Sequence, residues 1–155
     1  MGVLDRRYTF PFFIMNTFTR TITNELHSLE SLMHAITNFL EDQGVEAKAV
    51  YQINLALEEM ITNIIKFGYA DYDSHEIHVS MEVGEEEVVA RIEDDGREFN
   101  PLEEKPVAHG TPLEEKKVGG LGIHLIKKLL HSMEYRREGH RNILEIKALK
   151  KQPEA

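Results

Sequence analysis

Apolar side chains recur at helical spacing in three stretches of the chain. Within residues 24–42, about 46–67 and about 122–132, they alternate steps of three and four positions. This period lines apolar side chains along one face of an amphipathic helix. Gly44 and Gly68 follow the first two stretches, where glycine commonly ends a helix. The pattern therefore predicts three helices.

Other stretches alternate apolar and polar residues with a period of two. Residues 76–83 and 88–92 do so on either side of a short turn, which predicts a β-hairpin, and a second hairpin is expected to turn near residues 139–142. With an opening strand, the predicted order is β-α-α-β-β-lid-α-β-β. We expect an α/β fold, more narrowly an α+β two-layer sandwich, with helices on one face of a mixed, mostly antiparallel sheet.

The remaining segments set the expected domain boundaries. Residues 100–118 lack periodicity and contain three prolines, which is typical of a long lid or loop. We expect one domain at 17–149, an N-terminal arm at 1–16 and a frayed tail at 150–155. The arm is interpreted either as an extra edge strand or packing strap, or as a dimer contact through its aromatic residues Phe10, Phe12 and Phe13.

Composition narrows the possible partners. The chain has 155 residues, with 27 acidic against 18 basic side chains and a net charge of −9. This charge argues against general binding of a nucleic-acid backbone and favours a protein partner. The chain has no cysteine, which suits a reducing compartment, and we expect a cytoplasmic protein. The apolar run at 10–15 is too short for an export signal or a membrane span.

The second predicted helix carries the first candidate site. Glu59 and Asn63 lie four positions apart in the segment EEMITN, so they share one side of the helix, away from its apolar stripe. Asn63 offers a hard oxygen ligand for Mg²⁺, and Glu59 could accept a proton from an attacking hydroxyl. An ordinary solvated helix face is the alternative.

Asp94 carries the second candidate site, at the end of a predicted strand. It shares strand parity with inward-facing apolar residues, so its carboxylate should lie on the helix-covered face and need a hydrogen-bond donor. An adenine amine would satisfy it, and Gly96 would let a ring approach the backbone. Because Asp-Asp-Gly is also a common turn signal, a simple turn is the alternative.

Three glycines precede the third predicted helix. Free N–H groups at the start of a helix favour phosphate, which suits Gly119, Gly120 and Gly122 to a triphosphate tail. No strand leads directly into these glycines and no Gly-Lys-Ser/Thr follows them, so neither a dinucleotide fingerprint nor a Walker loop is present. A glycine turn that only starts a helix is the alternative.

Taken together, these segments resemble a known family. LALEEMITNIIKFGY, IEDDGREFNP and GGLGIHLIKKLLHSMEYRREGHRNILEI are similar to the three nucleotide-binding boxes of the GHKL ATPase superfamily, whose members include gyrase-type ATPases and histidine kinases. The likeness covers about residues 17–149 and is greatest to anti-sigma-factor serine/threonine kinases. It implies a Bergerat-type ATP-binding fold, with ATP and Mg²⁺ as cofactors.

The resemblance also implies residue roles. Glu59 would be the catalytic base, Asn63 would hold Mg²⁺, Asp94 would bind the adenine amine and Gly96 would shape the adenine pocket. Gly120 and Gly122, with Gly119 alongside, would meet the phosphates.

The same resemblance implies a lid and shows one departure, while the role of two lysines in the lid rests on spacing alone. Residues 102–118 would form the ATP lid, where Lys116 and Lys117 could add charge or simply be solvated. Phe67 stands where many relatives have a histidine, a departure that puts phosphotransfer in doubt more than binding.

The leading hypothesis is a stand-alone anti-sigma regulatory factor that phosphorylates serine or threonine on an anti-sigma-factor antagonist protein. The alternative is a nucleotide-gated protein that sequesters a sigma factor or another regulator with little or no transfer. A plain ATP hydrolase is a third class. Family members often work as dimers, so a homodimer is among the expected assemblies.

Overall fold

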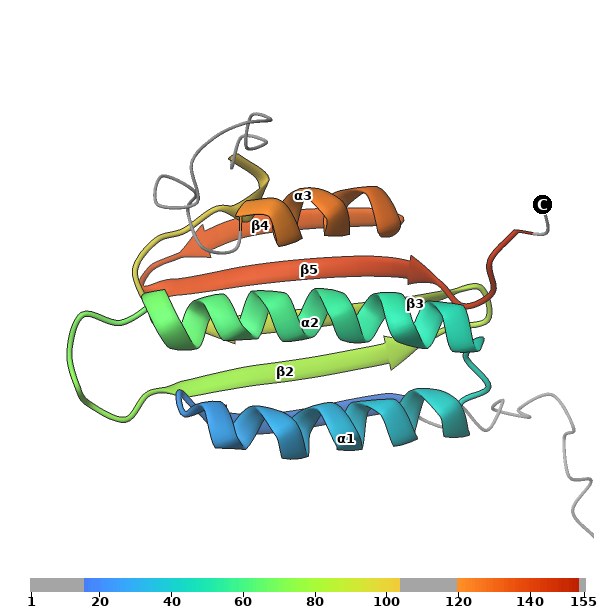
Figure 1. Ribbon diagram of the computed structural model, residues 1–155, viewed down its shortest axis with the longest axis horizontal. Helices are drawn as coiled ribbons and strands as arrows, with labels where there is room; N and C mark the ends of the chain where they lie inside the picture. The colour runs from blue at the N-terminus through green and yellow to red at the C-terminus, as the bar shows by residue number, and fades with distance from the viewer. Residues whose placement is uncertain (1–15, 104–119, 154–155) are drawn as a thin grey trace, which may run out of the picture.

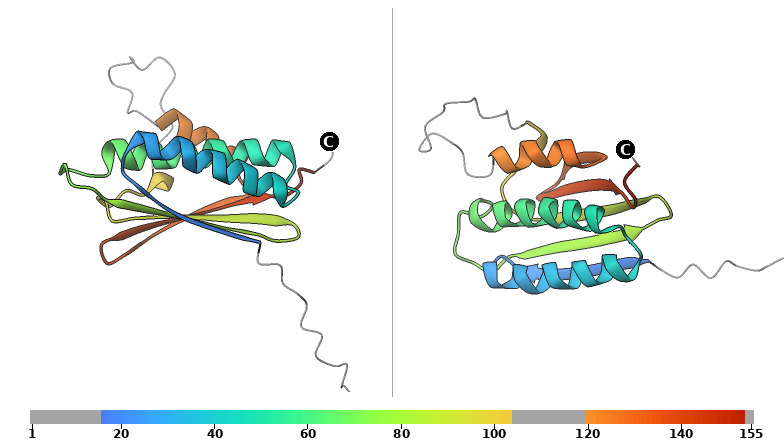
Figure 2. Two further views of the ribbon diagram at one scale, coloured as in Figure 1. Left: turned by 90° about the horizontal axis from the view of Figure 1, so that it is seen from below. Right: turned by 45° about the vertical axis from the view of Figure 1, so that its right-hand side comes forward.

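The protein folds as two layers, with three helices covering one face of a five-stranded sheet (Figure 1; edge-on in Figure 2, left). The computed structural model describes residues 16–103 and 120–153. In chain order its elements are β1 (Thr17–Thr23), α1 (Leu26–Asp42), α2 (Ala47–Phe67), β2 (Glu76–Val83), β3 (Glu87–Asp94), the short 3-10 helix η1 (Pro101–Glu103), α3 (Gly120–Leu129), β4 (Ser132–Glu138) and β5 (Arg141–Leu149). The predicted order of helices and strands is confirmed.

The sheet has the strand order β1-β2-β3-β5-β4, and each of its four pairings is antiparallel. The expectation of a mixed sheet was therefore too broad for the described strands. The central strand β3 ends beside the start of β5, so the polar residues at these two strand ends lie next to each other.

The core lies between the sheet and the helices. Strands β2 and β3 bury every second side chain, as the alternation predicted, and the apolar stripes of α1 and α2 cover them. The largest fully buried side chains come from both layers: Leu32, Ile36, Leu40, Ile53, Leu57, Ile61, Ile77, Val79, Val88, Ile92, Ile126 and Ile146. Helix α2 lies between α1 and α3 and is the central helix of its layer (Figure 1).

The start of the first helix differs from the prediction. Helix α1 begins at Leu26, because Asn24 uses its polar groups to hold the loop between α2 and β2. The Asn24 backbone N–H donates to the His75 carbonyl at 3.0 Å, and the Asn24 Oδ1 accepts the His75 backbone N–H at 2.9 Å.

The third helix and the last hairpin also shift. Helix α3 begins at Gly120 and ends at Leu129, and the His131 backbone N–H donates to the Lys147 carbonyl at 2.9 Å, so that Ser132 already opens β4. Asn142, expected in the turn, is instead a residue of β5, paired with Arg137 on one side and Asp94 on the other.

The described part of the C-terminal tail is tied down, contrary to the expected fraying. The Lys150 N–H donates to the Glu86 carbonyl at 2.8 Å, and the Gln152 N–H donates to the Glu46 carboxylate at 2.6 Å. The Gln152 Nε2 also donates to the Gln52 Oε1 at 3.0 Å. These bonds fasten residues 150–152 to the turn between β2 and β3 and to the N-terminal part of α2.

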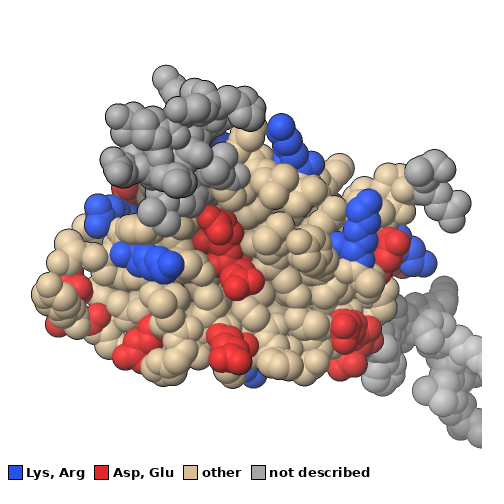
Figure 3. All heavy atoms as spheres, viewed as in Figure 1, with Lys and Arg blue, Asp and Glu red and all other residues tan. Residues whose placement is uncertain are grey.

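The surface carries mixed charge. On the face seen in Figure 3, the basic side chains lie in separate places and the acidic ones are spread between them. Within 16–103 and 120–153, no helix is long and apolar enough to cross a membrane. Residues 1–15 of the predicted arm at 1–16, with its three phenylalanines, lie outside the described residues.

Candidate nucleotide-binding site

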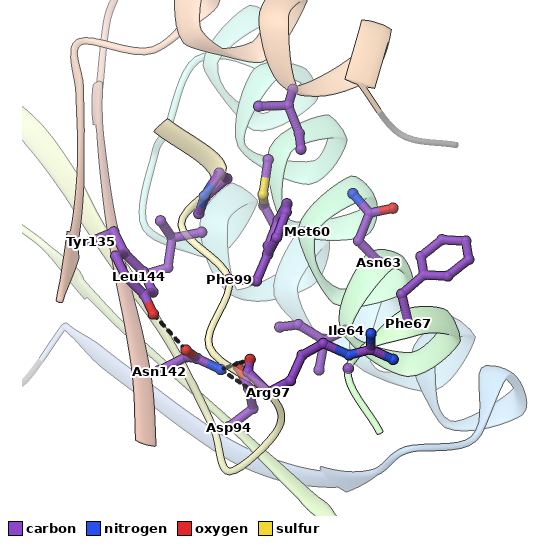
Figure 4. Close-up of a pocket in the computed structure, with 13 residues that line it drawn as sticks. Met60, Asn63, Ile64, Phe67, Asp94, Arg97, Phe99, Tyr135, Asn142 and Leu144 are labelled. Carbon is purple, nitrogen blue, oxygen red and sulfur yellow. Dashed lines mark hydrogen bonds between the residues drawn. The ribbon is translucent and has the colours of Figure 1, made fainter. Parts of the chain in front are cut away.

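A cavity of about 390 Å³ opens between the helical layer and the polar end of the sheet (Figure 4). This volume falls within the range of roughly 300–1,000 Å³ that is typical of small-molecule sites. Helix α2, the end of β3 and the strands β4 and β5 all contribute to its lining, which consists of Met60, Asn63, Ile64, Phe67, Gly68, Asp94, Arg97, Phe99, Pro101, Ile123, Tyr135, Asn142 and Leu144. Most of these side chains are apolar, and a few polar groups converge among them.

Asp94 supplies the buried carboxylate of the cavity. It is the last residue of β3, faces the helices as its strand parity predicted, and is only 3% exposed. Its Oδ1 accepts the backbone N–H of Gly96 at 2.8 Å and the Nδ2 of Asn142 at 3.0 Å. Burial raises the pKa of Asp94, and these two hydrogen bonds oppose that rise by stabilising the ionised form. The site thus holds a desolvated carboxylate, and its two donors among the described residues both bond Oδ1.

Gly96 allows the loop after β3 to pack closely against the end of α2. A Cβ at this position would lie 2.7 Å from the Gly68 carbonyl oxygen and 2.8 Å from the Asp94 Oδ1. The next N–H, that of Arg97, donates to the same Gly68 carbonyl at 2.8 Å. A side chain here would therefore displace Asp94 or separate the loop from the helix. The role of Gly96 toward an adenine ring stays a prediction.

Helix α2 carries Glu59 and Asn63, one turn apart. Both side chains are half-buried, and Asn63 lines the cavity. Glu59 lies against α3, where a Cβ on Gly122 would come within 2.5 Å of the Glu59 Oε1 and 2.6 Å of its Cδ. The missing side chain at Gly122 thus makes room for the Glu59 carboxylate. The fold brings Asn63 and Asp94 to one cavity, and Glu59 lies one turn before Asn63 on α2.

The glycine turn and the predicted lid are described only in part. Gly120 is the first residue of α3, whereas Gly119, Lys116 and Lys117 lie outside the described residues, as does the lid from 104 to 118. At its start, the predicted lid contributes Leu102, whose carbonyl accepts a hydrogen bond from the Lys127 Nζ at 2.9 Å. This bond joins η1 to helix α3 beside the cavity.

Two phenylalanines line the cavity and remain partly open to solvent. Phe67, at the position where the family resemblance implies a histidine, is 44% exposed, and Phe99 is 40% exposed. Phe67 adds an apolar surface at a position where a histidine would add a polar, titratable group. The departure noted in the sequence therefore falls within the site itself.

The sequence did not reveal four polar contributors to the site and its hydrogen bonds, namely Arg97, Tyr135, Arg137 and Asn142. Asn142 is 6% exposed and donates from Nδ2 to Asp94, while its Oδ1 accepts the Tyr135 hydroxyl at 2.6 Å and the Arg137 Nη1 at 2.9 Å. A signal existed, because Asn142 shares strand parity with the inward-facing Leu144. An asparagine at an inward position of a strand needs partners, and this would have directed attention to it.

The two-layer fold and this cavity define a class of nucleotide-binding α+β domains, and comparison with known proteins specifies the family. The family model described as the histidine kinase-like ATPase domain matches residues 22–148. The chain belongs to this family. The Bergerat-type fold that the resemblance implied is thereby confirmed.

The individual relatives share about a quarter to a third of their residues with this chain over the matched regions. The chain is 31% identical over 91 residues to the serine-protein kinase RsbW of Listeria monocytogenes serotype 4a, which covers 56% of this chain and 58% of the relative. It is 24% identical over 126 residues to the serine/threonine-protein kinase BtrW of Bordetella bronchiseptica, covering 81% and 84% of the two chains. The match thus spans little more than half the length of the RsbW relative.

A solved structure shares the fold. The crystal structure of the RsbU and RsbW domains of Rv1364c from Mycobacterium tuberculosis superposes with a TM-score of 0.61 at 14% sequence identity, covering 86% of this chain and 32% of that one. At this identity the likeness concerns the fold alone.

Proposed function

We propose that the protein is an ATP-dependent serine/threonine kinase that acts on a protein substrate. The observation that carries the proposal is the cavity itself, which combines a buried carboxylate at Asp94 with the Asn63 amide, while Glu59 lies one turn away on the same helix. The names of two relatives, serine-protein kinase RsbW and serine/threonine-protein kinase BtrW, support the same reaction class.

The base of the nucleotide is assigned to the Asp94 end. Within the described residues both donors to this buried carboxylate bond Oδ1, so its second oxygen is the acceptor that the proposal offers to a ligand. The 6-amino group of adenine is a donor that satisfies this acceptor. The apolar lining from Met60, Ile64 and Leu144 suits the faces of a planar ring.

The phosphates are assigned to the end formed by α2 and α3. The N–H groups in the first turn of α3, from Gly120 onward, favour negative charge, as helix N-termini do. Asn63 would be the protein ligand of Mg²⁺. Within the described ranges no group of three or more carboxylate or histidine side chains could hold a metal ion, so phosphate oxygens and water would complete the shell, as is usual for Mg²⁺.

Glu59 is proposed as the general base. In the transfer, the bond between the γ-phosphorus and the bridging oxygen of ATP breaks as a bond to the substrate hydroxyl oxygen forms. The hydroxyl proton passes to Glu59, and ADP leaves. Mg²⁺, when bound, neutralises charge on the phosphates. The chain itself orients the hydroxyl and removes its proton.

The substrate class follows from the resemblance to anti-sigma-factor kinases. We propose an anti-sigma-factor antagonist protein as the acceptor of the phosphoryl group, a sigma factor as a second binding partner, and a homodimer as the working assembly. The net charge of −9 supports a protein partner over nucleic acid.

Phe67 favours a second candidate, a nucleotide-gated protein that sequesters its partner without phosphorylating it. Its ring lies in the cavity lining where a polar group would assist proton removal. In this case nucleotide would still bind at Asp94, and the Glu59 carboxylate would be dispensable for partner binding.

Substitution of Glu59 by Gln separates these candidates. If Glu59 is the base, transfer from labelled Mg·ATP to the purified antagonist should fall by about 10²–10⁴-fold, while ATP affinity stays near that of the native protein. Glu58→Gln is the matched control, because Glu58 is the exposed neighbour of Glu59 on the same helix. Phosphoprotein should be measured together with released phosphate.

Two results would contradict the kinase assignment, and a third would contradict the role of Glu59. If the native protein yields no phosphoprotein but binds the antagonist in an ATP-dependent way, the sequestering protein is correct. If phosphate is released equally with and without the antagonist, the protein is a hydrolase. Full transfer by the Glu59→Gln variant would remove Glu59 from the mechanism.

A further inference from the structure

Asn142 is a polar side chain at an apolar position of the sheet. It lies on the inward face of β5, in line with Leu144, Ile146 and Ala148, and is 6% exposed. Burying an amide costs free energy unless each end finds a partner. Here Nδ2 donates to the Asp94 Oδ1 at 3.0 Å and to the Arg97 carbonyl at 2.9 Å.

The other end of the amide is equally engaged. The Asn142 Oδ1 accepts the Tyr135 hydroxyl at 2.6 Å and the Arg137 Nη1 at 2.9 Å (Figure 4 draws the Tyr135 contact). Arg137 also donates from Nη1 to the Gly96 carbonyl at 2.8 Å, which ties the loop after β3 to β4. Asn142 is therefore the centre of a network that joins three strands at the end of the cavity.

These partners fix the orientation of the amide. A guanidinium only donates hydrogen bonds, so the atom of Asn142 that faces Arg137 must be its oxygen. A carbonyl only accepts, so the atom that faces the Arg97 carbonyl must be the NH₂ group. Rotation of the amide by 180° would break both contacts at once. The group that Asn142 presents to Asp94 is consequently an N–H donor.

This orientation determines what Asp94 can offer to a ligand. Asn142 and the Gly96 N–H both donate to Oδ1 and favour the ionised carboxylate, against the burial that raises the pKa of Asp94. An ionised carboxylate is an acceptor only. A protonated one would carry a hydroxyl donor.

Other charged and titratable groups also act on Asp94. Asp95 raises its pKa and Arg137 lowers it, while Arg97 lines the same cavity. Tyr69 approaches from the loop after α2, and its own pKa is raised by burial and by Asp94. Asn142 differs from these groups because its amide does not titrate and donates a hydrogen bond directly to the Asp94 carboxylate.

We propose that Asn142, held by Tyr135 and Arg137, is the specificity-determining residue that makes this cavity select a 6-amino purine over a 6-oxo purine, by keeping Asp94 a pure hydrogen-bond acceptor. The proposal rests on the nucleotide site argued under the proposed function. Adenine presents an N–H donor at position 6, which matches an acceptor. Guanine presents a carbonyl there, which a protonated Asp94 could bind but an ionised one repels.

The test measures the dissociation constants of Mg·ATP and Mg·GTP by calorimetry between pH 5 and pH 8. Asn142→Leu removes the donor at similar volume, and Tyr135→Phe removes only the hydroxyl that holds the amide. Tyr72→Phe is the matched control, because Tyr72 is fully exposed. Thermal unfolding without nucleotide verifies that each variant is folded.

The native protein should prefer ATP by about 100-fold or more, and Asn142→Leu should reduce this preference about tenfold, consistent with the loss of one hydrogen bond to a charged group. Tyr135→Phe should reduce it about threefold, and Tyr72→Phe should leave it unchanged. The pH below which ATP affinity declines should move upward in Asn142→Leu, since Asp94 then takes a proton more readily.

Two outcomes overturn the proposal and distinguish it from the proposed function. Equal losses of ATP and GTP affinity in both variants, with no shift of the pH profile, would reduce Asn142 and Tyr135 to a structural role while the nucleotide site stands. If the native protein binds neither nucleotide, the proposed nucleotide site fails and the inference fails with it. If Asn142→Leu is unfolded, Tyr135→Phe alone decides between the two roles.

Discussion

The two ends of the cavity are built by different means. At the base end, where we propose that adenine binds, Asp94 and its partners come from neighbouring strand ends and are fixed by hydrogen bonds of 2.6–3.0 Å. At the phosphate end, where we propose that the triphosphate binds, Glu59 and Asn63 come from one helix, and Glu59 is positioned by packing against Gly122 on a second helix. Hydrogen bonds fix the orientation of a side chain and influence its charge state, whereas packing fixes only its position. We therefore expect the base end to determine which nucleotide binds and the phosphate end to determine whether its γ-phosphoryl group is transferred.

The largest effect is expected from Asp94→Asn at the base end. The donors from Gly96 and Asn142 would hold the new amide with its oxygen toward them, so its NH₂ group would face the cavity and meet the adenine amine donor to donor. ATP affinity should fall by about 100-fold or more. In thermal unfolding, ligand at about 100 times its dissociation constant adds about 2.7 kcal/mol to the native protein. At the same ligand concentration this gain should fall to about 0.4 kcal/mol or less in the variant, because its dissociation constant is at least about 100-fold higher.

The control for this prediction is Asp42→Asn, which removes an exposed carboxylate at the end of α1. It should keep the full shift with Mg·ATP. Because burial raises the pKa of Asp94, its charge opposes folding at neutral pH, so the Asp94→Asn protein without ligand should be no less stable than the native one. If Mg·ATP stabilised the Asp94→Asn protein as much as the native one, the adenine base would bind elsewhere than at Asp94.

A smaller effect, confined to the phosphate end, is expected from Gly122→Ala. The new Cβ would meet the far end of the flexible Glu59 side chain, which can move at little cost. The free energy of unfolding should stay constant or rise by up to about 1 kcal/mol, since alanine is the better helix former. Phosphotransfer to the antagonist should fall by about 10–100-fold, because the displaced Glu59 carboxylate, the proposed general base, no longer contacts the substrate hydroxyl.

The decisive comparison is between transfer and binding in the same variant. The affinity of Gly122→Ala for ATP should change by no more than about threefold if the only role of the glycine is to leave room for the Glu59 carboxylate. An equal loss of affinity and transfer would instead mean that Gly122 meets the phosphates directly, as the family resemblance implies. Leu125→Ala, an exposed substitution on the same helix, should alter neither quantity.

The same contrast explains which features could be read from the sequence. The elements were predictable because their periods are regular, and Asp94 was found because it continues the inward parity of β3. Glu59 and Asn63 were found from their spacing of one helical turn. Each of these inferences needs only one element.

The missed features require contacts between elements far apart in the chain. Asn142 looked like a turn residue beside Gly139, and only the pairing of β5 with both β3 and β4 assigns it to Asp94 and Tyr135. The close approach of Gly122 to Glu59 likewise depends on how α3 packs against α2. Local patterns therefore predicted the candidate side chains, whereas the network that sets their properties required the structure.

The smallest expected effect concerns the loop that flanks the base end. The His75 ring donates from Nε2 to the Asp71 Oδ1 at 2.7 Å when protonated, contacts the Asp95 Oδ1 through Nδ1 at 3.2 Å, and stacks on Tyr69 with ring centroids 4.1 Å apart. The hydrogen bond to Asp71 is the main cause that raises the pKa of His75. Protonation of this ring therefore favours the folded loop.

The sign of the pH dependence follows from the raised pKa. A base whose pKa is higher in the folded state contributes its stabilisation fully below the pKa of the unfolded chain, near 6.5 for His75, and loses it as the pH rises through the folded value. His75→Gln should thus lower the unfolding midpoint more at pH 5.5 than at pH 8.5, measured by thermal unfolding without nucleotide.

Asp71→Asn in the native background should flatten the same pH dependence, because it removes the nearer carboxylate. Equal losses at both pH values would mean that His75 acts only through its stacking on Tyr69. The preference for ATP over GTP should stay unchanged in His75→Gln, since this ring bonds Asp95 and not Asp94.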